Sequence, residues 1–199
     1  MSVRVLPALL AGALLWAAAP AQAEPRQYAI DPEHLSIGFL VEHIGYAGTL
    51  GMFRTAEGSF TFDEETGRLA DLRVVVDTTS VFTNNDRRDK HLRDDDFLDV
   101  KKHAQMVFTA AEGGPFRLGE SASLAGELTL LGVTLPLTLE VTWNKSATSP
   151  VPPGPYVLGA SARGTLQRSA FGMTYAVENG WVGDDVELII ELEAIRQSE

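Results

Sequence analysis

The side chains best suited to chemistry gather at residues 84–102, where positions 84–100 read NNDRRDKHLRDDDFLDV. With the two lysines that follow, this segment holds six cations and six aspartates around His91. As a metal site it has suitable ligand types, but adjacent aspartates do not share a face and the spacing matches no known metal loop. As a solvated, salt-bridged helix it needs no function. As a polar gate over a cavity it places cations near a ligand head group.

Motifs for catalysis are lacking in the sequence. It contains no cysteine, which excludes thiol catalysis and metal binding by thiolates. Its four histidines form neither His-x-His nor His-Glu-x-x-His, and there is no Gly-x-Ser-x-Gly or phosphate-binding loop. We therefore expect no enzyme, no metal ion and no cofactor.

Two further places have two interpretations each. His43 ends an apolar strand face, and it is either a core histidine with one hydrogen bond or a ligand contact. Residues 168–173 (RSAFGM) form either a strand-to-loop turn, in which Gly172 relieves strain, or a cationic and aromatic rim.

Charge and the N-terminal pattern restrict the partners and the compartment. The net charge of −11 argues against nucleic-acid binding, which needs clustered lysine and arginine. The chain starts with Arg4, an apolar run and Ala21-Gln22-Ala23, which is the pattern of a signal peptide. We expect residues 1–23 to be cleaved, residues 24–199 to form a single domain, and the mature protein to be periplasmic.

Alternating apolar and polar positions predict that most of the chain is β-strand. The clearest run is 133–143, which pairs with 124–130 as a hairpin through Leu131-Gly132. Similar runs raise the total to about eight strands with an inward apolar face, as in a sandwich or closed barrel. Such a barrel is either filled or holds one small ligand, and small inward residues such as Ala160 and Ala162 hint at a cavity. Residues 84–100 lack alternation and predict one or two short helical turns over one end or flank.

Several short motifs, in this order and spacing, resemble the YceI-like family of exported lipid-binding proteins. They lie at residues 28–34, 39–43, 51–53, 88–93, 96–100, 126–130, 132–138 and 168–173. The resemblance implies an all-β fold, an extended eight-stranded antiparallel lipocalin-like barrel with an apolar tunnel. It also implies a polyisoprenoid ligand, such as an isoprenoid quinone or a prenyl pyrophosphate, and no established catalytic residues. Two positions depart from the family: Leu35 replaces a usual serine, and Leu98 replaces a usual phenylalanine and is expected to change the tunnel's shape.

Together these observations predict a periplasmic carrier or store for a long isoprenoid lipid. Transient membrane contact and a homodimer remain open, as do a filled barrel that acts as a stress-related interaction protein and an enzyme that uses Asp89, His91 and Asp96. The residues expected to contact the lipid tail are Ile37, Phe39, Val41, His43, Phe53, Phe97, Phe108, Ala162, Phe171 and Met173. The residues expected to contact the head group are Arg88, Lys90, His91, Arg93 and Arg168.

Overall fold

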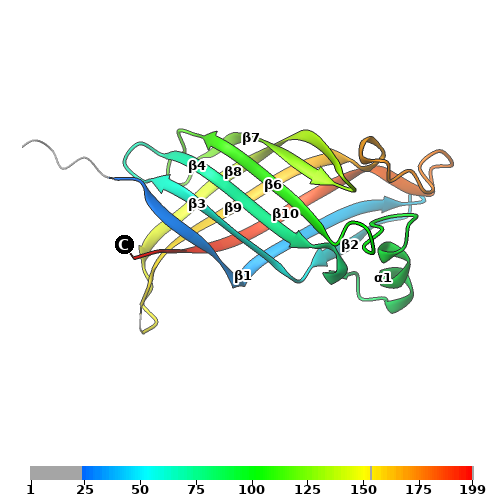
Figure 1. Ribbon diagram of the computed structural model, residues 1–199, viewed down its shortest axis with the longest axis horizontal. Helices are drawn as coiled ribbons and strands as arrows, with labels where there is room; N and C mark the ends of the chain where they lie inside the picture. Colours follow the sequence, from blue (N-terminus) through cyan, green and yellow to red (C-terminus); the bar gives the residue numbers. More distant parts are fainter. Residues whose placement is uncertain (1–23, 153, 199) are drawn as a thin grey trace, which may run out of the picture.

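The computed structural model describes residues 24–152 and 154–198, and the predicted signal peptide lies outside them. Ten strands and one α-helix form within this part of the chain, as Figure 1 shows. The strands are β1 (Arg26–His43), β2 (Ala47–Phe53), β3 (Ala56–Asp63), β4 (Arg68–Asp77), β5 (Val81–Phe82), β6 (Gln105–Gly113), β7 (Ser121–Leu130), β8 (Val133–Thr148), β9 (Tyr156–Gln167) and β10 (Val182–Arg196). The helix is α1 (Asp86–Arg93), and two 3-10 turns are η1 (Thr78–Ser80) and η2 (Arg168–Phe171). Over these described residues, no helix has the length and apolar character needed to cross a membrane.

The sheet closes because β1 pairs with strands on both of its sides. It runs antiparallel to β10, while its first residues pair with β3 and its last residues pair with β2. β2 and β3 act as one strand that is interrupted at Arg54 and Thr55, whose backbone N–H groups each donate to Ser80 Oγ at 3.1 Å. With β4 and β6 to β9, the described chain forms a closed antiparallel barrel of eight strands. The predicted barrel is confirmed.

The alternation in the sequence becomes the inside and the outside of the barrel. On β8, Leu137 and Leu139 are buried while Thr138 between them is exposed. Not every small inward residue makes room for a ligand. A Cβ on Gly126 would collide with the ring of Phe108, so this glycine accommodates a neighbouring side chain.

Aromatic side chains fill the end of the barrel at which β1 begins and β10 ends, on the left of Figure 1. Tyr28 is completely buried and stacks on Phe60 with ring centroids 5.4 Å apart. The hydroxyls of Tyr28 and Tyr156 donate to the two carboxylate oxygens of Glu64 at 2.6 and 2.9 Å. Burial, followed by the hydrogen bond to Glu64, raises the pKa of both phenols. Both hydroxyls therefore stay protonated at neutral pH and remain donors.

The helix α1 lies at the opposite end, beside the loops that connect β9 to β10 (Figure 1). The Asn85 side chain caps it by accepting a hydrogen bond from the Arg88 backbone N–H at 3.0 Å. Asp89 is buried and accepts from the Thr83 backbone N–H at 2.8 Å, which ties the helix to the end of β5. The predicted helical segment is confirmed, and it lies over one end of the barrel.

Candidate ligand-binding cavity

Two apolar cavities lie one behind the other inside the barrel. The outer cavity has a volume of about 360 Å³ and is lined in part by α1. The inner cavity has a volume of about 160 Å³ and lies deeper between the strands. Met106, Leu166 and Leu188 border both cavities, so these three side chains form the waist at which the two spaces adjoin.

Most residues predicted to contact a lipid tail lie on the walls of these cavities. The outer wall includes Phe39, Val41, His43, Phe53, Phe97 and Met173. The inner wall includes Ile37, Phe108 and Ala162. Among the described residues that border the inner cavity, every one is apolar. The barrel therefore gathers an apolar surface from distant parts of the sequence, and the indole N–H of Trp143 on this surface already donates to Ser146 Oγ at 2.9 Å.

Phe171 occupies a different position from the one predicted. It is 4% exposed, packs in the core cluster and borders neither cavity. It ends η2, and Gly172 then reverses the chain with a φ of 88°, in the left-handed region that favours glycine. Met173, the residue after this reversal, reaches the outer cavity instead.

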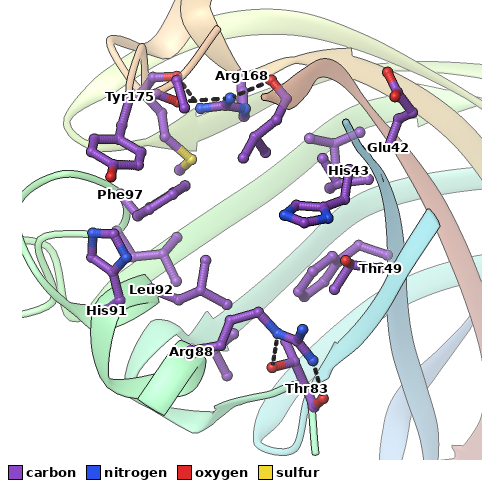
Figure 2. A pocket seen from close by; sticks show the side chains of 18 of the residues that line it. Glu42, His43, Thr49, Thr83, Arg88, His91, Leu92, Phe97, Arg168 and Tyr175 are labelled. Atoms are coloured by element: carbon purple, nitrogen blue, oxygen red, sulfur yellow. Dashed lines mark hydrogen bonds between the residues drawn. The ribbon is translucent and has the colours of Figure 1, made fainter. Parts of the chain in front are cut away.

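His43 and Leu98 both border the outer cavity. His43 is exposed on the wall of the outer cavity, across the opening from His91 in Figure 2, so the interpretation as a core histidine is wrong. Leu98 is buried and borders the same cavity, where a phenylalanine would occupy more of the space. Leu35, the other departure from the family pattern, borders the inner cavity.

Arg88, one of the cations predicted to contact a head group, borders the outer cavity and keeps N–H groups that can donate to a ligand. Its Nε donates to Thr83 Oγ1 at 2.7 Å, and its Nη2 donates to the Thr83 backbone carbonyl at 2.6 Å, as the dashed lines in Figure 2 show. Within the described chain, Nη1 has no hydrogen-bond partner. The guanidinium is thus fixed in orientation by Thr83 and still offers N–H groups at the wall of the outer cavity.

Arg168 also borders the outer cavity, but the protein itself uses most of its donors. The side chain is 2% exposed, and its guanidinium donates to four backbone carbonyls, those of Met173, Tyr175, Val182 and Gly183, at 2.7 to 2.9 Å. Burial lowers the pKa of Arg168, although the group stays a cation at neutral pH. We conclude that Arg168 braces the loop between η2 and β10.

The other two predicted cations do not border either cavity. Lys90 is exposed on α1. Arg93 donates from Nε to the Thr79 carbonyl and from Nη2 to the Val81 carbonyl, both at 2.7 Å. Arg93 therefore holds α1 against the chain that precedes it, and neither side chain is placed to meet a ligand inside the barrel.

His91 belongs to an aromatic cluster that joins α1 to the loop before β10. Its ring makes edge contacts with Phe97 and Tyr175, each with centroids 5.0 Å apart. Its Nε2 lies 3.0 Å from Asp96 Oδ2. Of the three residues in the enzyme alternative, His91 and Asp96 are thus paired, while Asp89 is buried and accepts from Thr83. His91 borders the outer cavity and presents one face of a polar ring there.

Several residues that border the mouth were not predicted from the sequence. They are Glu42, Ile44, Thr49, Thr83, Tyr175, Ala176, Trp181 and Val182. Five of these eight lie outside the strands, where the chain has no period that predicts direction. Tyr175 and Trp181, two aromatic residues in one loop, were the sequence signal that could have indicated a binding site there. Within the described residues, no group of three histidine, aspartate or glutamate side chains could hold a metal ion.

Comparison with known proteins decides the family. A family model described as the YceI-like domain matches residues 28–194. The chain belongs to the YceI-like family. A UPF0312 protein of Yersinia enterocolitica is 38% identical over 195 residues, with 97% of each chain covered.

Solved structures of YceI-like proteins have the same barrel. The YCEI protein of Campylobacter jejuni superposes with a TM-score of 0.64 at 27% identity, over 79% of this chain and 90% of that one. A polyisoprenoid binding domain from Saccharophagus degradans superposes with a TM-score of 0.64 at 16% identity, over 85% of this chain and 98% of that one. The second likeness concerns the fold. The chain thus shares the barrel of both solved proteins.

Proposed function

We propose that this YceI-like protein binds one long isoprenoid lipid and carries or stores it in the periplasm. The observation that carries the proposal is the pair of adjoining apolar cavities, wide at the mouth and free of polar side chains in their depth. Each buried CH₂ group contributes about 0.8 kcal/mol, so a branched hydrocarbon tail binds without any catalytic chemistry. The structural neighbour from Saccharophagus degradans, named as a polyisoprenoid binding domain, supports this ligand class.

The polar groups at the mouth favour a neutral head group over a pyrophosphate. A pyrophosphate needs several charge-assisted hydrogen bonds. Arg168 is already engaged by four carbonyls, and Arg93 is engaged by two. Arg88 and the rings of His43 and His91 then remain beside the acidic Glu42. A quinone, which presents neutral carbonyl acceptors, matches this small set of donors, so we propose an isoprenoid quinone.

The periplasmic location in this proposal rests on the signal-peptide pattern in residues 1–23. The expected mature N-terminus is Glu24, and the intact mass of protein from a periplasmic fraction tests it. A full-length chain recovered in the membrane fraction would contradict the cleavage.

The first test of the ligand is mass spectrometry of an organic extract of the purified protein. We expect an isoprenoid quinone at up to one molecule per chain. The second test uses quinones that share one head group and differ in tail length. Affinity should rise with each added prenyl unit until the inner cavity is filled. A protein that yields no lipid and binds no quinone of any length would refute the proposal and favour an interaction protein without a ligand.

A blocking substitution connects this test to the cavities. Ala162 is 7% exposed and borders the inner cavity, so Ala162→Trp should fill that space. Long-tailed quinones should then bind at least about tenfold more weakly, which corresponds to the loss of two or more buried CH₂ groups. Short-tailed quinones, which stay in the outer cavity, should bind as before. Thr165→Trp, on the exposed outer face of the same strand, is the matched control.

A further inference from the structure

Four large side chains project into water around the mouth of the outer cavity. They are Ile44, Tyr46, Tyr175 and Trp181, and their exposed fractions are 45%, 87%, 42% and 57%. We call them the lip. They come from two segments, the turn between β1 and β2 and the loop between η2 and β10, which lie together at the right-hand end of Figure 1. A cluster of exposed aromatic and aliphatic side chains at one end of a protein marks an interaction site.

The lip is held in place by the fold. The Ile44 backbone N–H donates to the Trp181 carbonyl at 3.1 Å, which joins the two segments. The Trp181 N–H donates to the Ala176 carbonyl at 3.2 Å. Arg168 holds the same loop by donating to backbone carbonyls that precede Trp181, at Met173 and Tyr175, and that follow it, at Val182 and Gly183. The aromatic side chains are therefore presented by a braced backbone.

The lip continues directly into the cavity. Ile44, Tyr175 and Trp181 are exposed to solvent and also border the outer cavity. Figure 2 shows Tyr175 at the edge of the opening, on the side of Arg168 and Phe97. An apolar path thus runs from the outside of the protein, across the lip and past the waist at Met106, into the barrel.

The charges within the two lip segments favour one kind of surface, and Arg88 lies across the opening from Tyr175 in Figure 2. The two segments, residues 41–50 and 173–185, contain no lysine or arginine. They do contain the exposed acidic side chains Glu42, Glu178 and Asp185. An anionic surface would be repelled by these carboxylates and by the net charge of −11. Tyrosine and tryptophan favour the boundary between lipid head groups and hydrocarbon, where an amphipathic ring has both environments.

We propose that the lip docks the open end of the barrel onto the surface of a zwitterionic phospholipid bilayer, which has no net charge. This inference rests on the proposed function, because it identifies the place where the lipid tail enters and leaves the cavity. With the lip in the interface, a tail passes between the bilayer and the barrel without crossing water. The aromatic side chains bind the surface, and the acidic groups around them restrict docking to zwitterionic lipid.

The test is co-sedimentation with vesicles. Wild-type protein should bind phosphatidylcholine vesicles, and it should bind less when phosphatidylglycerol replaces part of the lipid. The lip variant Tyr46→Ser should bind phosphatidylcholine vesicles about tenfold more weakly, as expected from the loss of buried aromatic area; Tyr46 is 87% exposed and borders neither cavity, so the change leaves the ligand site intact. Val151→Ser, at a 70% exposed site in the loop between β8 and β9 at the other end, is the control and should bind like wild type.

Binding of a short-tailed, water-soluble quinone without vesicles separates this proposal from the proposed function. The lip variant should keep that binding, which also shows that it is folded. Equal vesicle binding by wild type and lip variant, or tighter binding to phosphatidylglycerol, would overturn the docking proposal and leave the cavity function intact. The docking proposal is also overturned if the wild type forms a dimer in solution and the lip variant does not, because the lip would then bind a second copy. Loss of quinone binding by wild type itself would refute the proposed function instead.

Discussion

Substitution of Arg168 separates a structural brace from a ligand contact. The guanidinium is 2% exposed and donates to four backbone carbonyls at 2.7 to 2.9 Å. A hydrogen bond from a charged donor contributes about 1.5 to 3 kcal/mol, but the carbonyls of an open loop regain part of this from water. We therefore expect Arg168→Ala to lower the free energy of unfolding by about 3 to 5 kcal/mol, the usual cost of breaking a buried charged network.

Urea unfolding followed by circular dichroism measures this change. Arg93→Ala is the comparison, because Arg93 donates to only two carbonyls and is less buried, so about half the loss is expected. Arg168→Lys keeps the charge but lacks the planar fork, so it should recover only part of the stability. The reasoning is refuted if Arg168→Ala unfolds like wild type, with a change below about 1 kcal/mol, while its lipid binding is lost. Arg168 would then contact the head group, as its residue type alone suggests.

Three other substitutions test separate parts of the molecule. Arg88→Ala should weaken quinone binding by about 1.5 kcal/mol, the lower end for a hydrogen bond from a charged donor, with little salt dependence; a larger and strongly salt-dependent loss in titrations would indicate a charged head group. Tyr28→Phe should lower the free energy of unfolding by about 1 to 2 kcal/mol, because the Glu64 carboxylate loses a buried donor, and a thermal melt equal to wild type would contradict this. Hydrogen bonding to Asp31 raises the pKa of His34, so the pair stabilises the fold below pH 6.5 and loses this contribution as pH rises through the folded pKa. His34→Asn should flatten the stability profile in that range, and an unchanged profile would show that the exposed pair is fully screened.

The parts of the fold that repeat with period two were predictable from the sequence. A strand puts alternate residues on one face, and this alone places Ile37, Phe39 and Val41 on the cavity walls. The interruption between β2 and β3 was not predictable, because it depends on Ser80 from another turn accepting two backbone hydrogen bonds. The alternation of residues predicts which way a side chain points within a strand. It does not predict contacts between residues in different turns.

The cationic residues illustrate the same limit. Residue type alone suggested that Arg88, Arg93 and Arg168 would face a ligand. The structure separates them by the acceptors that each one meets: one hydroxyl and one carbonyl for Arg88, two carbonyls for Arg93, and four for Arg168. Those acceptors belong to irregular segments, whose backbone positions follow only from the folded loops.

The aromatic packing around Tyr28 and Glu64 lies at the end of the barrel opposite the lip, and it constrains the route of the proposed lipid. A tube open at both ends could span a gap and let a lipid slide through it. A barrel with one opening must take up the lipid tail first and release it by the reverse route. The head group is then the last part to enter and the first to leave. Transfer between two membranes then requires the whole loaded protein to detach, diffuse and turn around. Under the proposed carrier function, the transfer rate should therefore depend on the width and viscosity of the space between the membranes.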